Sequence, residues 1–127
     1  ILQSLNQTRD AIVAAGGNAP KGVRPPGGKI NDASKAVLAK AGMPSIVWSV
    51  DTLDWKTRNA QKAIDTVLSQ VKDGDIVLMH DLYEQSAIAA ETLIPELTKR
   101  GYQLVTVSEM AELRGGMAAG HSYGHFR

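Results

Sequence analysis

Short apolar runs, rich in β-branched residues, alternate with amphipathic helical patterns along this chain of 127 residues. Three runs have the length of a buried strand: SIVWSV (45–50), DIVLMH (75–80) and YQLVTV (102–107). Strands that alternate with helices form parallel βαβ units. The alternation therefore predicts an α/β fold, either layered or closed into a barrel.

Helical spacing and capping residues predict what lies between the strands. The expected helices cover residues 1–15, ended by two glycines; a short stretch capped by Asn31 or Asp32 and ended by Gly42; 60–71, capped by Asn59; 86–100, kinked or divided by Pro95; and 108–113. Residues 18–29 hold three prolines and three glycines, and residues 51–59 are polar, so both stretches are expected to be loops.

Composition excludes several classes of function. The net charge is +1 with interspersed signs, which predicts no nucleic-acid partner. Cysteine is absent, which excludes disulfides and thiolate chemistry. No apolar run approaches the roughly 20 residues of a membrane span. Because the chain opens at Ile1 and not at methionine, we expect a processed or excised segment.

Charged groups follow two of the predicted strands directly. Asp51 and Asp54 come after the first run, and His80 with Asp81 ends the second. Since sites gather at the carboxyl ends of parallel strands, Asp54 and His80 are expected at the same rim. A carboxylate beside an imidazole favours its protonated form and orients it, which suits a general acid. The alternative is that Asp54 caps a turn and His80 is a satisfied rim residue.

Arg24, in the loop rich in proline and glycine, is a further candidate. A guanidinium held by rigid prolines can bind a carboxylate through two hydrogen bonds. A solvated arginine is the alternative.

Four stretches together resemble one family: RPPGG (24–28), WSVDTLDW (48–55), IVLMHD (76–81) and GYQLVTVSEM (101–110). In order and spacing they are similar to motifs of the polysaccharide deacetylases, the NodB-homology domain of carbohydrate esterase family 4. The peptidoglycan N-acetylglucosamine deacetylases look most similar. The resemblance implies a partial or distorted (β/α) barrel with parallel strands, which lacks the first βα units.

The resemblance also implies catalytic roles. Arg24 would hold the catalytic base, Asp54 would tune His80, and His80 would protonate the leaving amine. Gly27 stands where the family usually has tyrosine, but its backbone N–H could still bind the oxyanion.

Three residues would complete the substrate site. Pro26 belongs to the same substrate-binding loop, while Trp55 and Leu78 would line a small apolar pocket for the acetyl methyl group. Taken alone, Trp55 and Leu78 would be explained by core packing.

The family's chemistry uses a divalent metal, held by an aspartate and two histidines, that activates water. The resemblance assigns the histidine motif H-[S/T]-x-x-H to His121 and His125 in HSYGH, and implies zinc, with cobalt or manganese as alternatives. Spacing of four predicts both imidazoles on one face of a helical turn. The metal aspartate and the base come from a TFDD-type motif, and the chain has no Asp-Asp pair.

The histidine motif stands at the carboxyl end, whereas in the family it precedes a helix that the segment opening at Ile1 resembles. Two hypotheses remain: a circular permutation or rearrangement, or an accidental histidine-containing extension. The first predicts a deacetylase-like domain over 1–113, a linker over 114–120 and a displaced histidine segment over 121–127. That segment should lie near His80 and not extend into solvent.

The resemblance thus implies a metal-dependent enzyme that removes acetyl groups from N-acetylglucosamine polymers of the peptidoglycan or chitin type. The alternatives are an acetylxylan esterase, or a catalytically incomplete fragment that binds glycan. The expected partners are the glycan and a complementary chain that carries the TFDD segment. The expected location is extracytoplasmic, secreted or associated with the cell wall.

Overall fold

The computed structural model describes residues 1–127 as two compact units. The first contains Ile1–Val47 and Ala111–Tyr123, and the second contains Trp48–Met110 and Gly124–Arg127. The division predicted at residues 113 and 120 stays a prediction. The helices and strands are α1 (Leu2–Ala14), a 3-10 turn η1 (Pro26–Gly28), α2 (Asp32–Lys40), β1 (Ser45–Ile46), β2 (Val50–Asp51), α3 (Asp54–Thr57), α4 (Ala60–Gln70), β3 (Val77–Leu78), α5 (Glu84–Lys99), α6 (Val107–Leu113) and β4 (Ser122–Tyr123).

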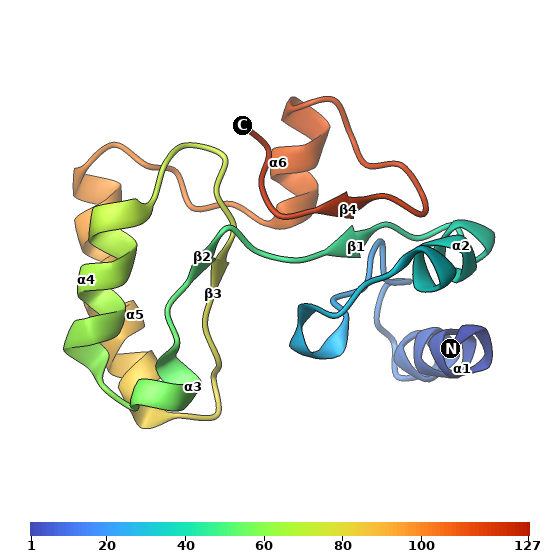
Figure 1. Ribbon diagram of the computed structural model, residues 1–127, viewed down its shortest axis with the longest axis horizontal. Helices are drawn as coiled ribbons and strands as arrows, with labels where there is room; N and C mark the ends of the chain where they lie inside the picture. The colour runs from blue at the N-terminus through green and yellow to red at the C-terminus, as the bar shows by residue number, and fades with distance from the viewer. The chain divides into compact units, whose positions relative to one another are not determined.

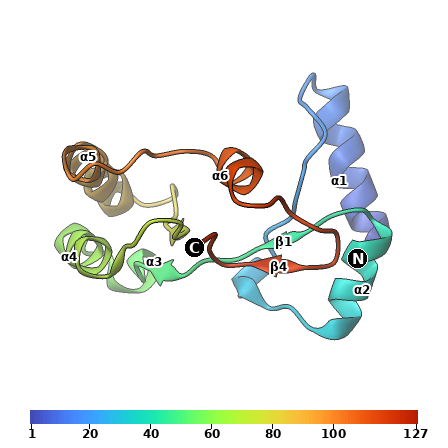
Figure 2. The ribbon, with the colours of Figure 1, turned by 90° about the horizontal axis from the view of Figure 1, so that it is seen from above.

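The first unit is built on the parallel pair β1 and β4, which Figure 2 shows side by side. Ser45 lies opposite Ser122, and the Ser45 N–H donates to the carbonyl of His121 at 2.8 Å. The helical turn predicted for HSYGH is therefore wrong, because its backbone groups pair with β1. An extended segment does not stack residues four apart on one face of a turn.

Local capping explains α2 as the sequence predicted. The Asn31 side chain accepts from the Ser34 N–H at 2.9 Å, and the Ser34 hydroxyl accepts from the Asn31 N–H at 2.9 Å. These reciprocal bonds satisfy backbone donors that a helix start leaves unpaired. Gly42 then adopts a φ of 71°, which lets the chain leave the helix.

The second unit is built on the parallel pair β2 and β3, with α4 and α5 packed together beside them (Figure 1). Asn59 caps α4 as predicted, by accepting from the Lys62 N–H at 3.0 Å. The apolar face of α4 packs on α5 and β2, and the buried core consists of Val50, Ala63, Ile64, Val67, Ala89, Leu93 and Leu97. Both strand pairs are parallel, which confirms the α/β class.

The predicted strand 45–50 is divided because its backbone changes partner. Val47 donates to the carbonyl of Tyr123 at 2.8 Å, whereas Ser49 and Val50 donate to the carbonyl of Ile76 at 3.0 and 3.2 Å. Residues 45–46 therefore belong to one ladder and residues 50–51 to another.

Two further predictions are corrected. The expected loop 51–59 contains the helix α3. Of the two effects predicted for Pro95, it does not divide α5, and a kink there stays a prediction. The expected strand 102–107 is not one, since no neighbouring strand in the chain pairs with its backbone. Instead Thr106 and Glu109 form a capping box, in which Glu109 Oε2 accepts from the Thr106 N–H at 2.8 Å, and α6 begins at Val107.

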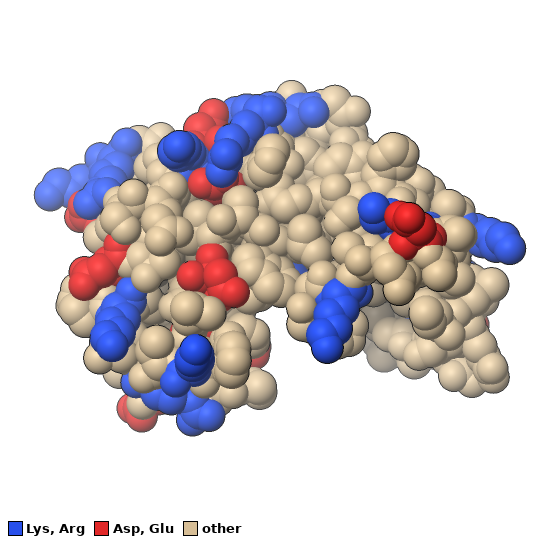
Figure 3. Space-filling view, viewed as in Figure 1, with Lys and Arg blue, Asp and Glu red and all other residues tan.

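The face drawn in Figure 3 carries basic and acidic side chains that are mixed together. This distribution agrees with the near-zero net charge. None of the helices combines the length and the apolar character that crossing a bilayer requires.

Candidate active site

Two successive parallel strands bring Asp54 and His80 together. Val50 of β2 pairs with Val77 of β3, and Asp51 pairs with Leu78, so both strands end at the same edge. Asp54 opens α3 three residues after β2, and His80 lies two residues beyond β3. His80 Nδ1 lies 2.8 Å from Asp54 Oδ1. The predicted meeting of these two side chains is confirmed.

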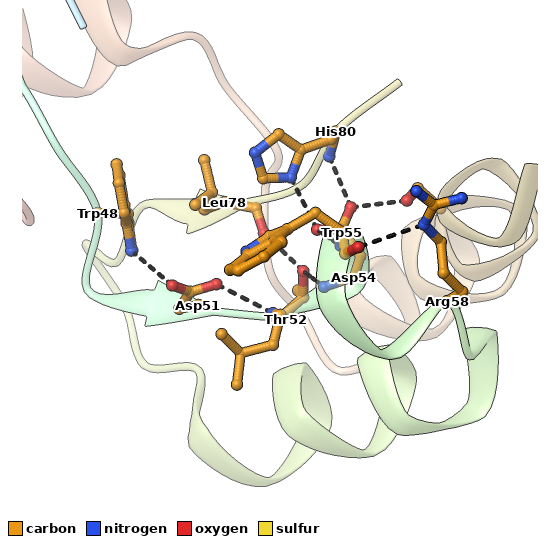
Figure 4. A network of polar contacts seen from close by, with 10 residues as sticks. Trp48, Asp51, Thr52, Asp54, Trp55, Arg58, Leu78 and His80 are labelled. Carbon is orange, nitrogen blue, oxygen red and sulfur yellow. Dashed lines mark hydrogen bonds and ion pairs between the residues drawn. The ribbon is translucent and has the colours of Figure 1, made fainter. Parts of the chain in front are cut away.

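The Asp54 carboxylate accepts four hydrogen bonds although it is only 2% exposed (Figure 4). Oδ1 accepts from His80 Nδ1 at 2.8 Å and from the Trp55 N–H at 2.9 Å. Oδ2 accepts from the His80 N–H at 2.7 Å and from the Ser86 hydroxyl at 2.6 Å. All four acceptor positions of the carboxylate are therefore used.

These donors keep Asp54 ionised. Burial by itself would raise the pKa of Asp54, but hydrogen bonds from Ser86, from the His80 ring and from the backbone of His80 and Trp55 lower it to about 2. An ionised carboxylate only accepts hydrogen bonds, so His80 Nδ1 must carry the proton between them. Nε2 is then the ring nitrogen that can exchange a proton with another molecule, and about a third of the His80 side chain is exposed.

The backbone around Asp54 is held by two neighbours. The Thr52 hydroxyl donates to the carbonyl of Leu78 at 2.8 Å, which ties the end of β2 to β3. Asp51 Oδ1 accepts from the Leu53 N–H at 2.9 Å, and Asp51 Oδ2 accepts from Trp48 Nε1 at 3.3 Å. Both links act at the point where the chain turns from β2 into α3.

Ser86 is the site residue that sequence reasoning missed. It lies in the first turn of α5, it is buried, and its hydroxyl makes the shortest of the four bonds to Asp54. A serine near the start of a helix is ordinary as an N-terminal residue. The sequence therefore gave no signal that separated Ser86 from a plain helix start.

The residues predicted to line the acetyl pocket differ in exposure. Trp55 is 48% exposed and stands next to the carboxylate in sequence, whereas Leu78 is 6% exposed within β3. Figure 4 shows both side chains in the neighbourhood of His80. Their role as pocket walls stays a prediction.

Arg24, Pro26 and Gly27 belong to the first unit, while Asp54 and His80 belong to the second. Arg24 lies between the bridge residue Val23 and the turn η1. Gly27 has a φ of 62°, and a Cβ built there would meet no atom within 4 Å. The roles predicted for these three residues stay predictions.

The histidine segment is anchored at the other end of β3. His125 forms an antiparallel bridge with Asp75, and Phe126, which is buried, donates its N–H to the carbonyl of Gly74 at 2.7 Å. Asp75 precedes His80 by five residues along the chain. The expected placement of His121 and His125 near His80 stays a prediction.

Asp75 is the anchor of this segment. Its side chain is fully buried, and its Oδ1 accepts from Arg127 Nε at 3.0 Å and Nη2 at 2.6 Å, and from the Ser49 hydroxyl at 2.9 Å. Burial would raise the pKa of Asp75, but the hydrogen bonds and the charge of Arg127 hold it below its ordinary value.

The donor set does not fit a metal centre. No group of three or more histidine, aspartate or glutamate side chains in the chain could hold a metal ion. A structural zinc site has four protein ligands and a catalytic one has three, so two imidazoles alone do not complete either.

Comparisons with known proteins place this geometry in a family. The family model for polysaccharide deacetylase matches residues 1–46. The chain is 43% identical over 113 residues to the peptidoglycan-N-acetylmuramic acid deacetylase PdaC of Bacillus subtilis (strain 168). The aligned residues make up 89% of this chain and 24% of that protein. The chain is 39% identical over 110 residues to the peptidoglycan-N-acetylglucosamine deacetylase PgdA of Listeria monocytogenes (strain 10403S), over 87% of this chain and 23% of that protein.

A solved structure agrees with the sequence matches. The structure of the T48 deacetylase with substrate superposes with a TM-score of 0.84 at 33% identity, over 97% of this chain and 62% of that chain. The fold is thus part of the (β/α) barrel of these enzymes. The chain spans about a quarter of the length of the curated relatives that it matches. It belongs to the polysaccharide deacetylase family, carbohydrate esterase family 4.

Proposed function

We propose that the chain forms part of a metal-dependent polysaccharide deacetylase that removes acetyl groups from N-acetylglucosamine polymers and releases acetate. The observation that carries the proposal is the buried, ionised Asp54 that orients the His80 ring. Family membership supplies the reaction class, and the peptidoglycan deacetylases among the relatives favour an N-acetylated glycan as substrate.

In this proposal His80 is the general acid. Amide cleavage expels an amine that must gain a proton, and a positioned imidazole contributes about 10²- to 10⁴-fold to such a step. Asp54 holds the proton on Nδ1, so Nε2 delivers its proton to the leaving nitrogen and takes one back from solvent. The negative charge of Asp54 stabilises the imidazolium that exists before Nε2 delivers its proton and again after Nε2 is reprotonated.

The chain alone does not supply the other half of the reaction. In the family a divalent metal activates the attacking water, and we propose zinc, with cobalt or manganese as alternatives. The donors present in this chain do not complete that centre. We propose that a complementary segment with an Asp-Asp motif provides the base and the missing ligand.

Acetate release from an N-acetylglucosamine oligomer tests the proposal. The chain is incubated with divalent metal, with and without a polypeptide that carries the Asp-Asp segment, and His80→Asn is compared with Asp65→Asn. Asp65 is an exposed carboxylate on α4 and serves as the matched control. We expect the rate of acetate release to fall by at least about 100-fold in His80→Asn and to stay unchanged in Asp65→Asn. No acetate, even with the segment in trans, would contradict the enzyme assignment.

A comparison of substrates separates the proposal from an acetylxylan esterase. Rates on acetylated xylan and on chitooligosaccharide are measured under the same conditions. Faster deacetylation of xylan would overturn the proposed substrate while leaving the role of His80 intact.

A second candidate follows from the absence of an Asp-Asp pair: a catalytically incomplete chain that binds glycan. Isothermal titration with glycan and with Zn²⁺ distinguishes it. Binding of glycan without any metal-dependent turnover, in the presence of the complementary segment, would favour this candidate.

We further propose an extracytoplasmic location, secreted or associated with the cell wall, where a peptidoglycan substrate would be found. Fractionation of the cells that produce the protein tests this. Recovery of the protein in the cytoplasmic fraction alone would contradict the proposal.

A further inference from the structure

Arg58 ends α3 in a conformation that arginine adopts at a cost. Its φ is 48° and its ψ is 37°, in the left-handed region. This conformation is unfavourable for a residue with a Cβ, and glycine is the usual residue where a helix ends this way. Arginine at this position therefore suggests that its side chain contributes something that glycine cannot.

The side chain of Arg58 makes two specific contacts. Nε donates to the carbonyl of Trp55 at 3.2 Å, and the guanidinium carbon lies 3.9 Å from the centre of the Tyr83 ring. A guanidinium over an aromatic face at this distance is a cation–π contact. The backbone N–H of Arg58 also donates to the backbone carbonyl of Asp54 at 2.9 Å, so Arg58 closes the helical turn that begins at Asp54. Asp54 and His80 form a dyad, and Figure 4 labels both of them together with Arg58.

Tyr83 lies on the other loop of the site. It follows His80 by three residues and precedes the first residue of α5. This loop has no regular structure over residues 79–83, and Leu82 within it is 80% exposed. The contact between Arg58 and Tyr83 thus joins the loop that carries Asp54 to the loop that carries His80.

We infer that Arg58 is a positioning residue that holds these two loops together through Trp55 and Tyr83. The strain of its backbone is offset by the two side-chain contacts. The bond between Asp54 and His80 then depends on a residue that touches neither side chain of the dyad. The catalytic consequence rests on the proposed function, but the structural consequence does not.

Arg58→Gly separates this inference from a role in ending the helix. Glycine relieves the strained φ and removes both side-chain contacts. If Arg58 only ends α3, the variant should be as stable as the parent or more stable. If Arg58 positions the loops, the amide of His80, which donates to Asp54 Oδ2, should exchange its hydrogen faster by about 2- to 5-fold, the worth of an exposed cation–π contact.

Arg100→Gly is the matched control. Arg100 ends α5 with an unstrained φ of −75°, and its guanidinium donates to Glu96 and to the carbonyl of Leu68. It belongs to the same unit and makes no contact with either loop of the site. We expect its replacement to leave the exchange rate of the His80 amide unchanged.

A second pair of variants keeps the test valid if glycine unfolds the turn. Tyr83→Phe keeps the ring and should exchange like the parent, whereas Tyr83→Leu should exchange like Arg58→Gly. Unchanged exchange in Arg58→Gly and Tyr83→Leu would overturn the inference. Hydrogen exchange is measured without any turnover. The exchange result therefore tests the positioning role of Arg58, whereas acetate release tests the proposed function, and either one can be refuted without the other.

Discussion

Replacing Asp54 by asparagine keeps the size of the side chain and removes its charge. The parent carboxylate accepts from four donors, two on each oxygen. Asparagine has one carbonyl oxygen, so in either orientation its amide nitrogen faces two of these donors. His80 Nδ1 and the Ser86 hydroxyl can each accept from that nitrogen, but the backbone N–H groups of Trp55 and His80 cannot. Asp54→Asn therefore loses at least one hydrogen bond and brings two N–H groups against one another in a site that is only 2% exposed.

The expected loss of stability follows from these contacts. A hydrogen bond to a charged acceptor contributes about 1.5–3 kcal/mol, and removal of one partner from a buried charged network costs about 3–5 kcal/mol. We expect a decrease of about 3–5 kcal/mol in the free energy of unfolding at pH 7, measured by urea denaturation. Asp65→Asn, on the exposed face of α4, should change it by less than about 0.5 kcal/mol.

The pH dependence of the same two proteins provides an independent check. The pKa of Asp54 falls from 3.8 to about 2 on folding. Since the folded pKa is the lower one, this group stabilises the folded state fully above about pH 4 and loses that contribution as the pH falls through 2. The difference corresponds to about 2 kcal/mol.

Asp54→Asn has no such group, so its stability should lack this part of the acid dependence. The difference in the free energy of unfolding between parent and variant should therefore decrease by about 2 kcal/mol from pH 6 to pH 2. Asp75, whose pKa is also lowered, is present in both proteins and cancels. A variant that loses less than about 1 kcal/mol at pH 7, or a gap that stays constant with pH, would refute the account of the site.

Three more variants test the second unit by urea denaturation. Val67→Ala should lower the free energy of unfolding by about 2–3 kcal/mol, because Val67 is 0% exposed in the core and the substitution leaves a cavity. A decrease of less than about 1 kcal/mol would show that neighbouring side chains fill the cavity. Gly74→Ala should be destabilising, because its φ is 85° and a Cβ would lie 2.6 Å from the carbonyl oxygen of Phe126; an unchanged midpoint would mean that the segment shifts without loss. Asp75→Asn should release the segment that ends at Arg127 and increase hydrogen exchange at the Phe126 amide, and protection equal to the parent's would contradict the anchor.

The sequence predicted what depends on local pattern and consecutive strands. Asp54 and His80 could be paired because each follows one of two successive apolar runs, and parallel strands end at the same edge. The capping of α2 and α4 was visible because Asn31 and Asn59 stand directly before helical periodicity. These signals involve neighbours in sequence or a rule of topology.

What the sequence did not reveal depends on partners far away along the chain. Residues 102–107 have the composition of a strand, but no neighbour pairs with them. His125 has the spacing of a metal motif, but its backbone pairs with Asp75, fifty residues earlier. Ser86 bonds to Asp54 although the two residues lie on different helices, 32 positions apart in the sequence. Local periodicity does not predict long-range pairs of this kind.

Asp75, which precedes β3, and Asp54, which bonds to His80 after β3, both have buried side chains. Only Asp54 has a partner suited to proton transfer. Asp75 is neutralised by Arg127, whose guanidinium does not lose its proton in proteins, so that pair is fixed in one charge state. Asp54 is held by four donors, of which one is the ring nitrogen of His80. The same residue type thus anchors a segment through a fixed cation in one case, and in the other orients an imidazole ring whose Nε2 is the proton donor in the proposed reaction.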